Sequence, residues 1–280
     1  MSVALNAGPR SHRARTRSRA WAWVWAETIH AEWTKLRTLA STGWLLAGTV
    51  ALTVAVSAAA AAAATAAAPG LDLARLSLAG VQAGQAVVAI LAVLVVGNEY
   101  STGMIRVTLT ATPRRLCVLA AKAALAGGLA LAAGAVAVLA SVLAGRLILP
   151  RHGFTPAHSY QLLSLGNGPD LRAVCGSVLY LTLIALLSLG IATAVRDSAV
   201  AIGSVLALLY LFPLVSAVVT NQHWQRHLEQ IGPMTAGLYI QATVGVHTLP
   251  LTPWQGLGVL ALWAAGALIL GALLLRFRDA

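Results

Sequence analysis

Six long apolar runs alternate with shorter polar connections along the chain. Each run holds about twenty residues free of Asp, Glu, Lys and Arg, the length that a helix needs to cross a bilayer core of roughly 30 Å. The runs are too long and too uniformly apolar to be barrel strands. They predict an all-α integral membrane protein, a six-transmembrane-helix bundle, with spans at about 44–64, 80–97, 123–143, 173–195, 198–220 and 255–275.

Residues 24–40, just before the first span, have the period of an amphipathic helix. Apolar side chains recur at spacings of three and four, and basic residues flank them. This pattern is typical of a helix that lies in the membrane interface with its tryptophans at headgroup depth. The residues expected on or beside its apolar face are Trp25, Ile29, Trp33, Lys35, Leu36 and Arg37.

Glu32 is the exception in this N-terminal amphipathic interfacial helix, because it projects on the apolar side. One interpretation is an i,i+3 ion pair with Lys35 near the membrane surface. The other is that Glu32 meets a specific polar group inside the bundle. The pattern leaves both interpretations open.

The composition supports a membrane protein, with 59% hydrophobic residues, 10% charged residues and a mean hydropathy of +0.80. Fourteen of the nineteen Lys and Arg residues fall before the first span, in residues 98–122, at Arg196 or in the C-terminal tail. The positive-inside rule then places both termini and residues 98–122 in the cytoplasm. Residues 1–23 are expected to be a disordered basic cytoplasmic tail that touches anionic lipid and no nucleic acid. The first span is expected to be retained rather than cleaved as part of a signal peptide.

The chemistry that the chain lacks limits its function. Ion-driven transporters generally keep ionisable groups inside their spans, and the predicted spans contain none. A Walker A loop needs a lysine after a glycine, but the two lysines, Lys35 and Lys122, do not follow glycine. No catalytic constellation or enzyme motif is visible. These absences predict a non-enzymatic subunit whose energy source docks from the cytoplasm.

A metal site at His223 and His227 is also weakly supported. The two residues have the i,i+4 spacing of helical metal ligands, and Glu229 follows closely. Because no third ligand stands at a suitable spacing, a solvated polar face is the better interpretation. We therefore expect no metal site and no cofactor bound by this chain.

The connection NEYSTGMIRVTLTATPRR, residues 98–115, lies between spans two and three and carries charges of both signs. Tyr100 to Gly103 can form a turn with a helix N-cap, and Pro113 breaks the chain before the next span. This pattern suits an ordered element that offers polar anchors to a soluble partner. The alternative is an interfacial loop whose arginines only obey the charge rule.

Two stretches carry a resemblance to a known family. AEWTKLRTLAST (31–42) and NEYSTGMIRVTLTATPRRLCVLAAK (98–122) resemble segments of the bacterial ABC-2-type ABC transporter permeases. Those proteins open with an E-x-x-K-L-R helix and carry an E-Y-x-x-G-[TM]-x-[RK]…P-x-R segment between spans two and three. The segment from Pro233 to Gly237 is similar to the family's connection between spans five and six. The resemblance extends from about Trp25 to Leu275.

The resemblance implies a transmembrane permease subunit in the bacterial cell membrane, and it implies an exporter of an amphipathic small molecule, lipid or peptide. Glu32 to Arg37 would be its connecting helix. A separate ABC ATP-binding subunit, carrying ATP and Mg, would dock on the cytoplasmic coupling segment, and two permease chains would form a homodimer or heterodimer. The implied partner-coupling residues are Glu99, Tyr100, Ser101, Thr102, Gly103, Arg106, Arg114, Arg115, Arg196 and Asp197.

Two other classes of function are compatible with parts of the sequence. An energy-independent membrane scaffold or sensory-complex subunit would share the six spans, but it need not keep a docking element. A membrane-embedded enzyme would need a polar cluster at membrane depth, and the sequence pattern shows none.

Overall fold

The computed structural model describes residues 29–38, 40–64, 71–101, 103–104, 115–154 and 166–277. Within these ranges the chain is helical and contains no strand. Six helices are long and apolar enough to cross a membrane, which confirms the all-α six-span bundle. They are α2 (Ala40–Ala63), α4 (Val81–Ser101), α6 (Arg115–Ile148), α7 (Gly168–Val195), α8 (Ser198–Val218) and α11 (Pro253–Phe277).

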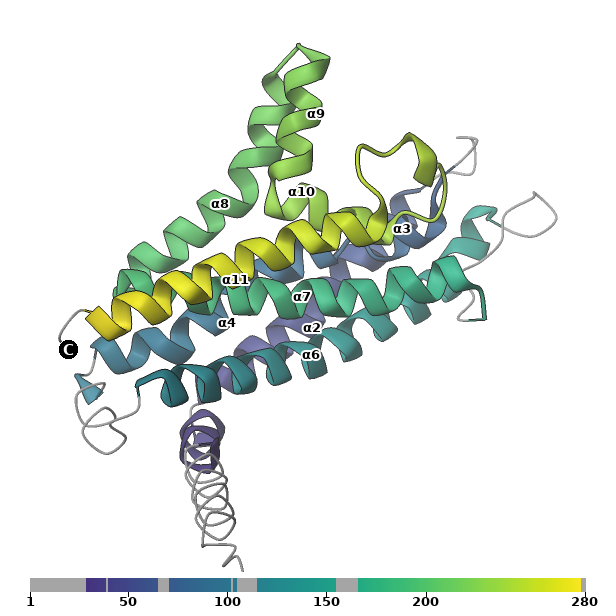
Figure 1. The fold of residues 1–280 in the computed structure, drawn as a ribbon. Helices are drawn as coiled ribbons and strands as arrows, with labels where there is room; N and C mark the ends of the chain where they lie inside the picture. Colours follow the sequence, from purple (N-terminus) through teal and green to yellow (C-terminus); the bar gives the residue numbers. More distant parts are fainter. Residues whose placement is uncertain are drawn as a thin grey trace, which may run out of the picture.

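The helices α4 and α7 form the centre of the bundle and are the most buried of the six. α11 and α6 pack along α7, and α2 packs on α4 and α6. Figure 1 shows the long helices side by side, with α7 between α11 and α6. Tyr180, Leu181 and Ile184 of α7 are fully buried in this core.

Small and hydroxyl side chains allow close packing at the edge of the bundle. The buried stripe of α2 is Thr49, Thr53, Ser57 and Ala61. The Ser57 hydroxyl accepts a hydrogen bond of 3.0 Å from the backbone N–H of Gly80, at the start of the α4 region. Such small-residue faces are how helices associate in lipid, where apolar burial between helices gains little.

Several helices extend beyond the apolar runs that predicted them. α6 begins at Arg115, whereas the third span was expected to start at 123, and α4 continues to Ser101. The backbone hydrogen bonds of both helices thus continue past the uncharged stretch. These extensions carry Glu99 and Lys122 into the bundle, where both side chains are buried. The expectation of an interior without ionisable groups is therefore wrong at this end.

This charged end of the bundle is the one at which α2, α6 and α8 begin and α4, α7 and α11 end. Residues 29–38 are helical and precede α2 there. Figure 1 shows this N-terminal segment turned across the direction of α2 rather than continuing it.

Short helices shape the opposite end. They are α3 (Leu73–Ser77), η1 (Leu149–His152), α9 (Gln222–Ile231), α10 (Pro233–Leu238), η3 (Tyr239–Gln241) and η4 (Val246–Thr248). Asp72 caps α3 by accepting from the N–H of Arg75 at 3.1 Å. The same carboxylate accepts from the N–H groups of Thr243 at 2.6 Å and Val244 at 3.0 Å. Asp72 thus clamps the early α3 turn to the segment before the last span.

The helix α8 leaves the bundle as it runs away from the charged end, and α9 folds back along it (Figure 1). α10 then returns the chain into the core, where Met234, Ala236 and Leu238 are buried. The connection between α8 and α11 is thus formed by α9, which lies outside the core, and by α10 and η3, which are buried in it.

Gly190 should be intolerant of any side chain, because α7 and α11 meet there backbone to backbone. A Cβ at this position would lie 2.5 Å from the carbonyl carbon of Ala267 and 2.6 Å from the amide nitrogen of Leu268. We expect Gly190→Ala to lower the free energy of unfolding by about 1–3 kcal/mol, the usual cost of overpacking. Thermal unfolding of the purified protein measures this.

Gly128→Ala in α6 is the matched control, because nothing lies within 4 Å of its added Cβ. Alanine favours a helix more than glycine does, so this variant should be neutral or slightly stabilised. Equal melting temperatures for the two variants would contradict the close approach of α7 and α11.

Candidate functional site: a buried ion-pair cluster

Four charged side chains meet at the charged end of the bundle and form what we call the ion-pair cluster. Its members are Glu32 and Lys35 from residues 29–38, Glu99 from the last turns of α4, and Lys122 from α6. Three of them are almost fully buried, with exposed fractions of 4% for Glu32, 6% for Glu99 and 3% for Lys122. The cluster therefore joins three separate elements through charges that are removed from solvent.

Each ammonium group of the cluster bridges the two carboxylates. The Lys122 Nζ lies 2.6 Å from Glu32 Oε2 and 2.9 Å from Glu99 Oε1. The Lys35 Nζ lies 2.8 Å from Glu32 Oε1 and 2.9 Å from the same Glu99 Oε1. Two positive and two negative groups thus alternate, and the cluster is neutral as a whole once the partly exposed Lys35 is included.

Both interpretations of Glu32 hold in the structure. The i,i+3 pair with Lys35 is present, and the other carboxylate oxygen meets Lys122 inside the bundle. Leu36, one turn after Glu32, is buried on the same face and packs in the main hydrophobic core. The face turned to the bundle is thus centred on Glu32 and Leu36.

The remaining residues predicted for the interfacial helix lie around this face. Ile29 and Lys35 are partly buried, and Arg37 is exposed. Trp33 was expected on the same face as Leu36, but its side chain is 43% exposed. Its exposure to the surroundings of the bundle agrees with an aromatic residue at a membrane interface. Trp25 lies outside the described residues.

The cluster controls the ionisation of the two residues on the N-terminal segment. Burial alone would raise the pKa of the Glu32 carboxyl, but the charge and hydrogen bond of Lys122, with those of Lys35, lower this pKa below its ordinary 4.5. Burial alone would lower the pKa of Lys35, but its bonds to Glu32 and Glu99 raise this pKa above 10.5. Both groups are therefore held in their charged forms.

Glu99 has one oxygen without a partner. Its Oε1 accepts from both lysines, whereas Oε2 is buried and has no hydrogen-bond partner among the described residues. A cavity of about 480 Å³ lies beside it, bordered by Glu32, Lys35, Glu99 and the apolar side chains of Leu36 and Leu94. A buried acceptor atom without a hydrogen bond lowers the stability of the folded state, so this oxygen marks a place where a donor is missing.

The residues expected to couple to a partner differ in their surroundings. Thr102, Arg106 and Arg114 lie outside the described residues, and of Ser101 only the backbone, at the end of α4, is described. Gly103 has a φ of +70° and is exposed. Glu99 is buried in the ion-pair cluster, so its carboxylate is not presented to a soluble partner.

The other coupling candidates have structural contacts at the same end. Asp197 caps α8 by accepting from the N–H of Val200 at 2.8 Å. Arg196 lies over the ring of Tyr100, 5.8 Å from its centroid. Arg115 donates to the carbonyl of Leu275 at 2.9 Å, near the C-terminus of α11. A cation there also interacts favourably with the helix dipole.

Sequence reasoning missed Lys122 as a site residue. It lies between apolar stretches and has no periodic relation to Glu32, which is 90 residues earlier. The available signal was the rarity of lysine, since the only two lysines in the chain both belong to the cluster.

The histidine pair on α9 does not form a metal site with its neighbours. The Nε2 atoms of His223 and His227 are 3.2 Å apart. Glu229 instead accepts a hydrogen bond from the Tyr239 hydroxyl. Among the described residues no group of three or more His, Cys, Asp and Glu side chains could hold a metal ion.

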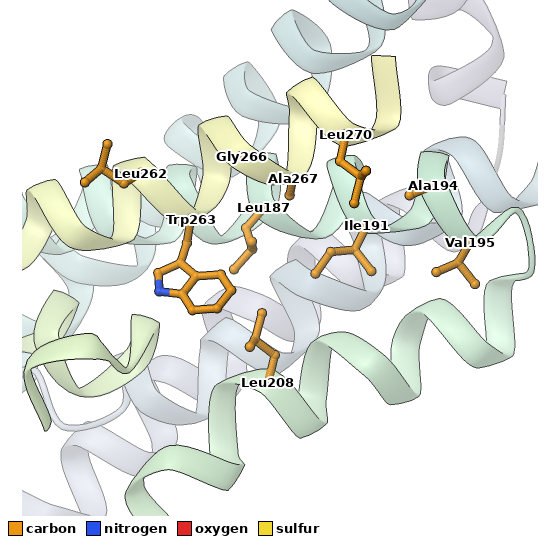
Figure 2. Close-up of a pocket in the computed structure, with 10 residues that line it drawn as sticks. All are labelled: Leu187, Ile191, Ala194, Val195, Leu208, Leu262, Trp263, Gly266, Ala267 and Leu270. Carbon is orange, nitrogen blue, oxygen red and sulfur yellow. The ribbon is translucent and has the colours of Figure 1, made fainter. Parts of the chain in front are cut away.

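An apolar groove of about 500 Å³ opens where α8 separates from α7 and α11. Figure 2 shows Trp263 and Leu187 on one side of it, facing Leu208 of α8. The indole N–H of Trp263 donates to the carbonyl of Ile231 at 2.9 Å, so the one polar atom of this ring is satisfied. The groove itself offers only apolar surface. Its lining residues are Leu187, Ile191, Ala194, Val195, Leu208, Leu262, Trp263, Gly266, Ala267 and Leu270.

No protein-family model matches the chain, and no curated protein matches it.

Lys122 should be the most sensitive member of the ion-pair cluster. Lys122→Met keeps the length of the side chain but leaves two buried carboxylates short of a counter-charge. We expect a loss of about 3–5 kcal/mol in the free energy of unfolding, as for other broken buried pairs. Lys35→Met should cost less, because the Lys35 side chain is 35% exposed and water partly replaces it.

The double variant Glu32→Gln with Lys122→Met tests the same contact. It removes both charges of this contact at once, so it should lose less stability than the sum of the two single losses. Denaturant or thermal unfolding in detergent gives the values for the unaltered protein, the two single variants and the double variant. Equal losses for Lys122→Met and Lys35→Met, with additive losses in the double variant, would contradict the buried contact.

The contribution of Glu32 to the stability of the folded protein should decrease as the pH falls. Because its folded pKa lies below the ordinary 4.5, its stabilisation is complete above that value and disappears as the pH falls through the folded pKa. The melting temperature of the unaltered protein should therefore exceed that of Glu32→Gln at neutral pH, with a gap that narrows below pH 4.5. A gap that stays constant in acid would show that Glu32 is not held ionised.

Proposed function

We propose that this protein is the transmembrane permease subunit of an ABC-2-type ATP-driven transporter. It sits in the bacterial cell membrane with both termini in the cytoplasm, pairs with a second permease chain, and exports an amphipathic small molecule, lipid or peptide. ATP and Mg bind to a separate ABC ATP-binding subunit. That subunit docks on the segment between α4 and α6.

The ion-pair cluster is the observation that carries this proposal. It links residues 29–38, the end of α4 and the start of α6 through contacts of 2.6–2.9 Å. The two stretches that resemble the permease family, 31–42 and 98–122, supply all four of its members, and Lys122 is the last residue of the second stretch. A push on the segment between α4 and α6 would therefore move all three elements together.

Within this proposal Glu99 is a positioning residue rather than a contact residue. Its buried carboxylate holds the end of α4 to Lys35 and Lys122. The contact with the ATP-binding subunit falls on the residues after it, among which Met104 is 48% exposed. Arg106 and Arg114, which follow in the sequence, are the charged anchors that we assign to the docking segment.

The apolar groove supports an amphipathic substrate class. Its walls come from α7, α8 and α11, and its lining contains no charged residue. A hydrophobic tail gains contact area in such a groove, whereas a polar solute would lose its hydration without finding hydrogen-bond partners.

An energy-independent scaffold or sensory subunit is the second candidate. The ion pairs of the cluster would also suit a protein that does not change conformation, since buried charges can fix one packing arrangement. The two candidates differ in whether an ATP-binding protein accompanies the chain.

Affinity purification of the tagged chain from its own membranes, followed by mass spectrometry, tests the proposal. We expect a soluble protein with a Walker A motif in near-equal amount, with an ATPase rate that the permease raises. The double variant Arg106→Ala, Arg114→Ala should lose most of this partner. Arg226→Ala on α9 is the matched control, because the predicted topology places it on the opposite side of the membrane. This variant should retain the partner.

A chain that purifies without an ATP-binding protein, under conditions that preserve known transporter complexes, would reject the permease and favour the scaffold. Retention of the partner by the double variant would reject the docking segment alone.

A further inference from the structure

The cavity beside the ion-pair cluster has two chemically different walls. Its volume is about 480 Å³, and it opens between residues 29–38 and the last turns of α4. Glu32, Lys35 and Glu99 form the charged wall. Leu94 and Met104 form part of the apolar wall. Such a cavity fits an amphiphile with a charged head rather than a uniformly polar solute.

The unpartnered oxygen of Glu99 indicates what the head must supply. Both lysines of the cluster already bond to Oε1, and Oε2 has no donor among the described residues. Glu99 is nine-tenths buried, so bulk water does not compensate this oxygen. A cationic N–H donor would make the strongest hydrogen bond available to it.

Lys35 suggests the second charge of the ligand. Its side chain is 35% exposed and borders the same cavity. A phosphate placed a few ångströms from the donor would meet this ammonium group, as phosphates do elsewhere. A molecule that combines an ammonium, a neighbouring phosphate and apolar tails is an ethanolamine phospholipid.

The surroundings of the cavity favour a lipid over a basic side chain from a protein. Trp33 and Met104 lie at this end with large exposed fractions, and α4 is apolar over most of its length. Exposed aromatic and apolar side chains near the end of a span are typical of the headgroup region of a membrane.

We propose that this cavity binds the headgroup of phosphatidylethanolamine. Because Oε2 of Glu99 is buried, the Glu99 side chain shifts toward the cavity on binding, so that the ammonium donates to Oε2 while Lys35 and Lys122 keep Oε1. The phosphate lies beside Lys35, and one acyl chain follows Leu94 and Met104. This site does not depend on the proposed transport function, because its residues and its test involve no ATP-binding partner.

Lipid binding to the full-length purified protein tests this site. The protein is delipidated in detergent and titrated with palmitoyl-oleoyl phosphatidylethanolamine, phosphatidylcholine or phosphatidylglycerol, and bound lipid is counted by native mass spectrometry. Phosphatidylcholine has the same phosphate and tails but no N–H on its headgroup. We expect it to bind about tenfold more weakly, the effect of losing one charge-assisted hydrogen bond.

Two variants locate the binding. Glu99→Gln should remove most of the preference for the ethanolamine lipid, because the charged acceptor is lost. Leu94→Trp should block the cavity without touching the ion pairs, so it decides the matter if Glu99→Gln fails to fold. Asp197→Asn, at the α8 cap outside the cavity, is the control and should keep the preference.

Three results would overturn the proposal. Equal binding of the ethanolamine and choline lipids would show that no N–H donor is read. Equal binding of phosphatidylglycerol would show that only the phosphate is recognised. An unchanged preference in a folded Glu99→Gln or in Leu94→Trp would place the binding elsewhere on the protein.

Discussion

The pairing of buried charges at one end of the bundle is the constraint on which the arrangement of this protein depends. Glu32, Glu99 and Lys122 are removed from water and carry one excess negative charge, which the partly exposed Lys35 compensates. Residues 29–38, the end of α4 and the start of α6 must therefore meet at one point. The cluster thereby restrains the rotation of α4 against α6 and the direction of residues 29–38.

The sequence was a good guide to the number of spans and a poor guide to their ends. Uncharged runs report the hydrocarbon thickness, whereas a helix ends where its backbone hydrogen bonds end. α6 therefore begins at Arg115 and includes Lys122, which the apolar run had excluded. The pattern also could not decide between the two interpretations of Glu32. Its neighbour Lys35 is visible in the local spacing, but its partner Lys122 is distant along the chain. Arg196 and Asp197 were predicted to couple to a partner, and the sequence pattern did not reveal that they also contact Tyr100 and cap α8.

Some helices of the bundle are held by many more packing contacts than others. α4, α6 and α7 share the core, and α4 and α6 also carry ion pairs, whereas α8 is the least buried of the six spans and contains Pro213. The apolar groove lies where these two parts meet, with α7 and α11 on one side and Leu208 of α8 on the other (Figure 2). Its width depends on how far α8 and the attached α9 stand from the core. A change in that separation would alter the groove without breaking the buried contacts at the charged end.

The Asp72 clamp has a consequence for the synthesis of the chain. Its carboxylate accepts from residues 171 and 172 positions later, so the ribosome must synthesise the chain through Thr243 and Val244 before the clamp can close. Before that point Asp72 can cap only α3, and α2, α3 and α4 can contact only one another and the helices already synthesised. Closure at Thr243 and Val244 then comes with the arrival of α11, the last span. A chain that stops before residue 243 would leave this carboxylate without its hydrogen bonds to Thr243 and Val244.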